Sequence, residues 1–203
     1  MDLSGRQLLD AVSAPTPTPG GGSAAAFSGA MGTALLVLVA SLPKTRHGTP
    51  DDREALDVAA RALMPLRDHL AALVDEDTAA YDAVVGAYRL PKGTEGEKRA
   101  RQEAIQVALR RATDVPLDVM RAVEASARES VAVARHGNPS AATDAGVGLQ
   151  LLRAASAGAS LNVKVNLAQL RDEAYVTEVT GSARRLEVAL HASLAQAEQA
   201  FGG

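Results

Sequence analysis

Apolar residues recur at alternating three- and four-residue intervals over residues 51–89, the spacing of one face of a packed helix. Asp77 takes one position in this stripe, and all the others are apolar. The apolar positions are Leu56, Ala59, Leu63, Leu66, Leu70, Leu73, Ala80, Val84 and Ala87. The pattern predicts a long helix that Pro65 kinks or splits, with one carboxylate on its inner face.

The remaining hydrophobic pattern predicts helices along most of the chain. An uncharged run from Ala24 to Leu42 predicts a helix that is buried on all sides. Helical spacing also predicts helices over 95–136, kinked at Pro116, and over 172–200, with a short amphipathic helix over 4–13. No alternating strand pattern is present. The sequence therefore predicts an all-α fold, a single-domain bundle over residues 1–203 of long, kinked helices around a central apolar helix.

The turn before the central helix is rich in proline and glycine. Gly20, Gly21 and Gly22 allow another molecule to approach the main chain closely, and Ser23 is expected to cap the helix. Free N–H groups at such a helix start suit an anionic or carbonyl oxygen of a ligand. The alternative is a flexible linker before a buried helix. Gly137 is predicted to be a left-handed helix cap.

Composition and charge exclude several classes of function. The chain has 203 residues and a net charge of −3, which argues against nucleic acid as the main partner. It has no cysteine, which fits a reducing, cytoplasmic compartment. Residues 22–42 are long enough to span a bilayer, but a Pro- and Gly-rich segment precedes them, without a Lys/Arg-rich start. We expect a buried bundle helix and no membrane partner.

Two aspartates are candidates for acid–base chemistry. Asp77 lies in an apolar stripe, where burial would raise its pKa, and Tyr81 is its neighbour four residues later. The alternatives for Asp77 are contact with water at that turn or a structural pair with an arginine. Asp144 lies in a glycine-rich segment, where it would act in catalysis or simply stabilise the start of a helix.

Polar residues near the helix breaks are candidates for ligand binding. The amides of Asn138, Asn162 and Asn166 suit a heterocycle rich in donors and acceptors. Asp144, Asn162 and Asn166 fall near one line if residues 139–170 form one helix, whereas a break at Gly158 would separate them. Lys44, Arg46 and Lys92 lie beside helix breaks and could hold an anionic tail. The four histidines are scattered without a paired metal signature, so no metal is expected.

Seven short motifs follow one another along nearly the whole chain. They are residues 17–23 (PTPGGGS), 77–82 (DTAAYD), 90–92 (LPK), 112–117 (ATDVPL), 137–138 (GN), 144–148 (DAGVG) and 159–167 (ASLNVKVNL). In this order they resemble the cyclodeaminase/cyclohydrolase family of folate enzymes. That family includes the C-terminal domain of formiminotransferase-cyclodeaminase and the bacterial methenyltetrahydrofolate cyclohydrolases. Residues 41–46 (SLPKTR) depart from the family's Asn-Leu-Thr segment with several lysines, and Thr143 stands where serine is common.

The resemblance implies an all-helical subunit, a homodimer, a folate site in a cleft near the subunit interface, and no metal or redox cofactor. It implies hydrolysis of 5,10-methenyltetrahydrofolate to 10-formyltetrahydrofolate, with Asp77 and Asp144 as acid and base and Tyr81 orienting or stacking. The glycine turn, Ser23 and the three asparagines would bind the ligand, and Lys44 and Lys92 would meet its glutamate tail. Two alternatives stay open: a formiminotetrahydrofolate cyclodeaminase that releases ammonia, and a non-catalytic folate-binding helical dimer.

Overall fold

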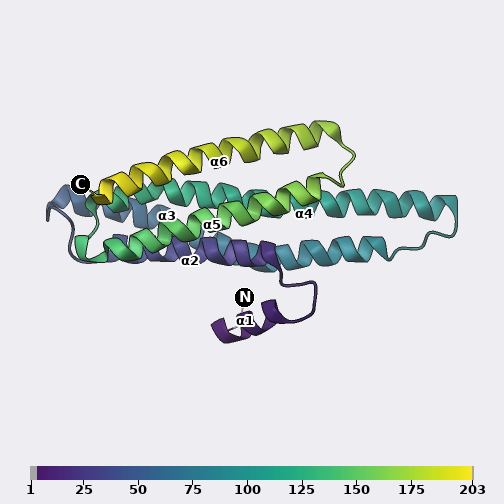
Figure 1. Cartoon of the computed structure of the whole chain (residues 1–203), viewed down its shortest axis with the longest axis horizontal. Helices are drawn as coiled ribbons and strands as arrows, with labels where there is room; N and C mark the ends of the chain where they lie inside the picture. Colours follow the sequence, from purple (N-terminus) through teal and green to yellow (C-terminus); the bar gives the residue numbers. More distant parts are fainter. Residues whose placement is uncertain (1–3, 203) are drawn as a thin grey trace.

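The computed structural model describes residues 4–202, and every regular element among them is a helix (Figure 1). The α-helices are α1 (Gly5–Ser13), α2 (Gly21–Ser41), α3 (Pro50–Tyr88), α4 (Glu95–His136), α5 (Ala142–Leu167) and α6 (Glu173–Gly202), with one 3₁₀ turn, η1 (Pro139–Ala141). The all-α prediction is confirmed. The predicted helix positions hold within a few residues.

Local sequence sets the helix boundaries. Thr49 and Asp52 form a reciprocal capping box at the start of α3, and Thr94 with Glu97 does the same for α4. Pro65 lies inside α3 and does not split it, so that alternative was wrong. Gly158 likewise leaves α5 continuous. Helix α3 tolerates the backbone hydrogen bond that Pro65 cannot make, since packing of the apolar face supplies most of its stability.

Helix α2 lies between α3 and α5, and α4 packs behind it (Figure 1). Its interior side is fully buried, as at Ala26, Leu36 and Ala40. Antiparallel α5 approaches α2 most closely where a Cβ on Gly32 would lie 2.8 Å from the Gly148 carbonyl oxygen. Among residues 4–202, α2 is the one helix whose length and composition would let it cross a membrane, and 56% of its most apolar window is buried inside the bundle.

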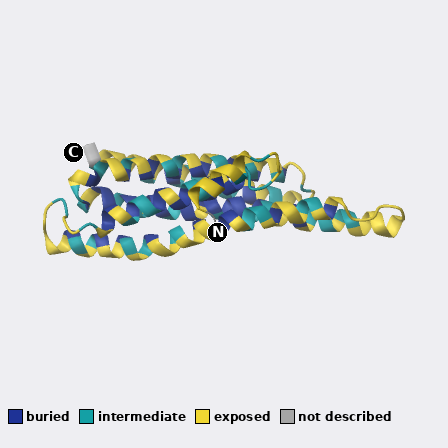
Figure 2. Ribbon diagram, turned by 90° about the horizontal axis from the view of Figure 1, so that it is seen from below, coloured by how far each residue is buried: buried dark blue, intermediate teal, exposed yellow. Residues whose placement is uncertain are grey.

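The end of α3 and the start of α4 extend beyond the rest of the bundle (Figures 1 and 2). This hairpin is mostly exposed, and Lys92 lies in the turn that joins its two helices. The mixed burial of this region contrasts with the buried centre of the bundle in Figure 2. Lys92 is therefore presented on a projecting arm.

Three local expectations were wrong. Gly20 is the N-cap of α2 and Ser23 lies inside the first turn, because the helix starts three residues earlier than expected. Gly137 ends α4 with φ −64°, in an extended and not a left-handed conformation. The amphipathic pattern of α1 predicted one shared apolar side for Leu8, Leu9 and Val12, but Leu8 is buried whereas Leu9 and Val12 are exposed.

Candidate functional site

A cleft of about 240 Å³ lies at the start of α2, between α3, α4 and α5. The Pro- and Gly-rich turn forms one wall through Pro17, Thr18 and the three glycines that follow. The other walls come from three helices. Their lining residues are Asp77, Tyr81, Val84, Leu109, Ala112, Asn162, Val165, Asn166 and Gln169.

Asp77 is held at the start of α2 by direct contact with the glycine turn. The Ser23 hydroxyl donates to Asp77 Oδ2 at 2.7 Å. Gly22 lies against the same carboxylate, since a Cβ at this position would be 2.1 Å from Asp77 Oδ1. Only glycine at position 22 leaves room for this arrangement. The turn and the carboxylate are therefore one structural unit.

Partial burial raises the pKa of Asp77, and hydrogen bonds from the side chain and backbone of Ser23 oppose that rise. A carboxylate with this balance is poised to exchange a proton with a bound water or substrate. No arginine or lysine lines the cleft, so the alternative of a structural ion pair does not apply there. Asp77 has the environment expected of an acid–base group.

Two asparagines of α5 place amide groups in the cleft. Asn162 Nδ2 donates to the Gly158 carbonyl at 2.9 Å, and Asn166 Nδ2 donates to the Ala112 carbonyl at 2.6 Å. Within the described part of the chain, neither amide oxygen receives a hydrogen bond. Both oxygens are thus available as acceptors for N–H groups of a heterocycle.

The remaining walls supply a ring and free backbone donors. Tyr81 lies in the cleft at 43% exposure, so its ring has a free surface on which a planar ligand can stack. The N-cap Gly20 makes no side-chain capping bond, and α2 has no acidic residue in its first turn. The N–H groups of Gly21 and Gly22 therefore stay open to a ligand oxygen, whereas the N–H of Ser23 donates to Asp77.

The structure brings together eight of the predicted site residues and separates four. Gly20, Gly21, Gly22, Ser23, Asp77, Tyr81, Asn162 and Asn166 meet at the cleft. Lys44, Asn138 and Asp144 lie at the opposite end of the bundle. Asp144 is about 27 Å along α5 from Asn162, given a rise of 1.5 Å per residue. Lys92 lies on the arm. Asp144, Asn138 and the two lysines do not line the cleft.

Sequence reasoning missed several lining residues. The sequence placed Val84 in the apolar stripe of α3 and Ala112 among the inward residues of α4. It singled out neither Leu109 nor Gln169. Val84 follows Tyr81 on the inner face of α3, and this spacing was the one available signal. Leu109 and Gln169 carried no such signal, because only the tertiary packing of α4 and α5 brings them to the turn.

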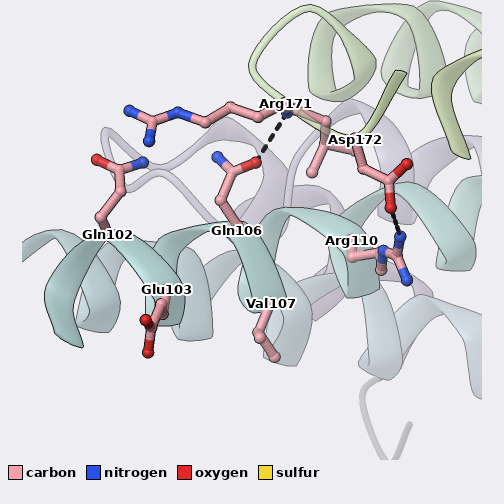
Figure 3. Close-up of a pocket in the computed structure, with 8 residues that line it drawn as sticks. Gln102, Glu103, Gln106, Val107, Arg110, Arg171 and Asp172 are labelled. Atoms are coloured by element: carbon pink, nitrogen blue, oxygen red, sulfur yellow. Dashed lines mark hydrogen bonds and ion pairs between the residues drawn. The ribbon is translucent and has the colours of Figure 1, made fainter. Parts of the chain in front are cut away.

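A larger groove of about 500 Å³ lies beside α4, but its polar side chains Gln106, Arg110 and Asp172 already serve the fold (Figure 3). Gln106 accepts a hydrogen bond from the Arg171 backbone at 2.9 Å and donates to the Gln169 carbonyl. Arg110 pairs with Asp172 and stacks over the ring of Tyr175. These contacts fix the turn between α5 and α6. None of the predicted site residues lines this groove.

Residues 4–202 contain no group of three or more His, Cys, Asp or Glu side chains arranged to hold a metal ion. Histidines occur at the far end of the bundle, where His136 Nδ1 lies 2.7 Å from Asp52 Oδ1. Hydrogen bonds from Thr49 and from His136 to the carboxylate hold the pKa of Asp52 well below its usual range. The pair of His136 and Asp52 anchors the loop before α3.

Comparison with known proteins places the chain among folate enzymes. The family described as formiminotransferase-cyclodeaminase matches residues 4–185. A methenyltetrahydrofolate cyclohydrolase from Methylorubrum extorquens is 41% identical over 84% of this chain and 82% of its own length. A chicken formimidoyltransferase-cyclodeaminase is 34% identical over 88% of this chain, which spans only 33% of that longer enzyme. The crystal structure of a formiminotetrahydrofolate cyclodeaminase from Thermotoga maritima superposes with a TM-score of 0.88 at 28% identity, covering 100% of this chain and 97% of that one. The chain belongs to the formiminotransferase-cyclodeaminase family.

Proposed function

We propose that this protein is a methenyltetrahydrofolate cyclohydrolase, which converts 5,10-methenyltetrahydrofolate and water to 10-formyltetrahydrofolate. The observation that carries the proposal is the half-buried Asp77 carboxylate, held by Ser23 in a cleft with no other charged lining residue. Its support from outside the structure is the 41% identity to a cyclohydrolase over most of both chains.

In the proposed reaction the bridging carbon of the substrate is an amidinium-like cation that water attacks directly. Asp77 accepts a proton from that water as the carbon–oxygen bond forms, and its charge stabilises the cation beforehand. The tetrahedral adduct then collapses. The hydroxyl of the adduct loses its proton to solvent as the formyl C=O bond forms and the carbon–N5 bond breaks. N5 takes up the proton that Asp77 accepted from water, and the formyl group stays on N10, so that one proton is released in total.

The other cleft residues bind and orient the substrate in this proposal. Tyr81 stacks on the fused ring of the substrate or orients the Asp77 carboxyl. The amide oxygens of Asn162 and Asn166 accept hydrogen bonds from N–H groups of the substrate ring. The open N–H groups at Gly21 and Gly22 bind a substrate oxygen. Because the carboxylate, amides and backbone suffice for this chemistry, we propose a reaction without a metal or redox cofactor.

A second candidate reaction is the cyclodeaminase reaction, favoured by the likeness to the Thermotoga maritima enzyme over the full chain. There N10 attacks the formimino carbon and ammonia leaves, through a tetrahedral centre at the same position. An acid–base carboxylate serves both reactions, so Asp77 has the same role in each.

The experiment that separates the two follows the absorbance of 5,10-methenyltetrahydrofolate with purified protein, against its spontaneous hydrolysis. Saturable, enzyme-dependent loss with no ammonia from 5-formiminotetrahydrofolate supports the cyclohydrolase. Ammonia release without acceleration of hydrolysis would replace it by the cyclodeaminase. Tight folate binding with neither turnover would identify a non-catalytic folate-binding protein.

The setting of the protein is part of the proposal. We propose that it works in the cytoplasm, as its lack of cysteine suits a reducing compartment, and that neither a nucleic acid nor a membrane is its partner. We also propose that it is a homodimer.

A further inference from the structure

Thr78 follows Asp77 on α3, and its hydroxyl forms no bond within that helix. A threonine inside a helix can donate to the carbonyl oxygen four residues earlier. The threonines of this chain that do so are Thr33, Thr113 and Thr177. Among residues 4–202, the only hydrogen-bond partner of the Thr78 hydroxyl is the hydroxyl of Ser23, at 3.4 Å. The Thr78 side chain therefore points to the contact between α3 and α2, beside the cleft.

Ser23 contacts two consecutive residues of α3 with one hydroxyl group. The hydroxyl donates to Asp77 Oδ2 at 2.7 Å, and its oxygen lies 3.4 Å from Thr78 Oγ1. Ser23 is only 1% exposed, so water does not compete for this hydroxyl. In the described part of the chain it has no third partner. The orientation of the Ser23 hydroxyl is therefore decided by these two side chains of α3.

The charge on Asp77 fixes the direction of both hydrogen bonds. A carboxylate has no hydrogen and can only accept, so the Ser23 hydroxyl must donate to it. A serine hydroxyl has one hydrogen, and that hydrogen is then used. The hydrogen between the two hydroxyl oxygens must consequently come from Thr78. The three side chains form a donor chain that runs from Thr78 through Ser23 to the carboxylate of Asp77.

A donor chain that ends on a charge favours the charged form. Donation from Thr78 polarises the Ser23 hydroxyl, which becomes a better donor to Asp77. The gain is larger for the carboxylate than for the neutral acid, because hydrogen bonds to ionised groups are stronger. It opposes burial, which raises the pKa of Asp77. The separation of 3.4 Å is long for two hydroxyls, and hydrogen bonds at catalytic groups often tighten when substrate binds.

We propose that Thr78 is a positioning residue of the reaction, whose hydroxyl acts through Ser23 to hold the Asp77 carboxylate ready to accept a proton from water. This rests on the proposed function, since that reaction needs Asp77 in its ionised form at the start of each turnover. Thr78 does not line the cleft, so it acts without touching the substrate. Its whole effect passes through the Ser23 hydroxyl.

The other groups around Asp77 leave this role to the donor chain. Among the described residues that line the cleft, Tyr81 is the one other titratable side chain, and the walls from α2, α4 and α5 contribute none. Arg111 of α4 pairs with Glu76, the residue before Asp77, so its charge is already compensated. The charge state of Asp77 therefore depends on burial and on the donors that reach it from Ser23.

Two substitutions of Thr78 separate its hydroxyl from its shape. Thr78→Val keeps the branched side chain without the hydroxyl and should shift the acid limb of the kcat/KM profile to higher pH, because a weaker bond from Ser23 raises the pKa of Asp77. Thr78→Ser should follow wild type, as should the control Thr177→Val on α6, whose hydroxyl bonds only to its own helix. If the valine variant does not fold, Thr78→Ala takes its place. Activity lowered equally at every pH, or not at all, would overturn the proposal.

A double-mutant cycle tests whether Thr78 acts through Ser23. Ser23→Ala breaks the donor chain, so adding Thr78→Val to it should cause no further shift of the acid limb. The shift caused by Thr78→Val alone should also be smaller than that of Ser23→Ala, since Thr78 only strengthens a bond that Ser23 makes. A further shift of the same size in the double variant would mean that Thr78 reaches Asp77 by another route, and the proposal would be wrong.

A titration of the Asp77 side-chain carboxyl carbon by NMR in the ligand-free protein needs no turnover. The signal is identified by its absence in Asp77→Asn. Its midpoint should move to higher pH in Thr78→Val and further in Ser23→Ala, and it should stay in place in Thr78→Ser. An unchanged midpoint in Thr78→Val would overturn the donor chain even in an active enzyme. The expected midpoints in a protein that turns over neither folate substrate would instead remove the proposed function and leave the donor chain.

Discussion

At the scale of single residues, the site depends on how Gly22, Ser23 and Asp77 fit together. The pKa of Asp77 is raised mainly by burial, and Ser23 moderates that rise with its hydroxyl and backbone N–H. Because the native state binds the proton more tightly than the unfolded chain, the stability of the protein falls as pH rises from about 3.8 through the native pKa of Asp77. The ionised form of Asp77 therefore lowers the free energy of unfolding, while it provides the base that the proposed reaction needs.

Asp77→Asn should raise the free energy of unfolding at pH 7, because it removes a half-buried charge and keeps an oxygen for the Ser23 hydroxyl. Urea unfolding at pH 7 and at pH 3 measures this. The gain should be present at pH 7 and much smaller at pH 3, where Asp77 is protonated in both states. A loss of stability at pH 7 would mean that the charge is compensated by a group not identified in the cleft.

Ser23→Ala should shift the acid limb of the kcat/KM profile to higher pH. The hydroxyl lowers the pKa of Asp77, so its loss raises that pKa, and the base form is then lost at a higher pH as the solution is acidified. The profile of wild type and variant at constant ionic strength provides the measurement. A shift to lower pH, or none, would show that the hydroxyl does not act on the catalytic carboxyl.

Gly22→Ala should lower kcat by about 10–100-fold while the fold is kept, because the added methyl displaces the carboxylate from its position. Gly21→Ala is the matched control, since its Cβ would approach only the side chain of Asn162, at 4.0 Å. Steady-state kinetics of both variants measures kcat, and circular dichroism checks that both keep the fold. Equal effects of the two substitutions would mean that backbone freedom, and not the contact with Asp77, is what position 22 requires.

At the scale of elements, the close approach of α2 and α5 positions the asparagines opposite the glycine turn. Gly32 and Gly148 form the closest contact, where each would direct a Cβ at the other's carbonyl oxygen, at 2.8 Å and 3.0 Å. Ala25 similarly faces Gly158. These small residues let the two backbones lie close enough for Asn162 to reach the cleft from one helix and Gly21 from the other.

Gly32→Ala should destabilise the protein by about 1–3 kcal/mol, because a methyl group there forces the two backbones apart. Gly146→Ala is the control on α5, where a Cβ would meet nothing within 4 Å and alanine favours the helix, so it should be neutral or stabilising. Thermal unfolding of both variants measures the difference. Equal stability of the two would contradict the tight packing of α2 on α5.

At the scale of the whole molecule, the sequence predicted the helices well because the apolar stripes are regular. Leu56, Leu63 and Leu70 are fully buried, and Asp77 lies half-buried where the stripe meets the cleft. The helix start at Gly21 was missed because glycine is a poor helix former, and tertiary contact with Asp77 outweighs its propensity. The separation of Asp144 and Lys44 from the cleft follows from helix length, since a continuous α5 places Asp144 about 27 Å from Asn162 and α2 lies between the glycine turn and Lys44. The sequence interpretation missed it because a break at Gly158 stayed open. The approach of Leu109 and Gln169 to the turn depends on tertiary packing and was not predictable.

The cyclohydrolase proposal is tested most directly by single-turnover decay of 5,10-methenyltetrahydrofolate with wild type and Asp77→Asn at pH 7. Wild type should accelerate the decay well above the spontaneous rate, and the variant should bind substrate but lose about 10²–10⁴-fold in rate, the usual contribution of a general base. Substrate binding by both proteins, measured by fluorescence, controls for the fold. A variant that hydrolyses the substrate at the wild-type rate would contradict the role of Asp77 and the site described here.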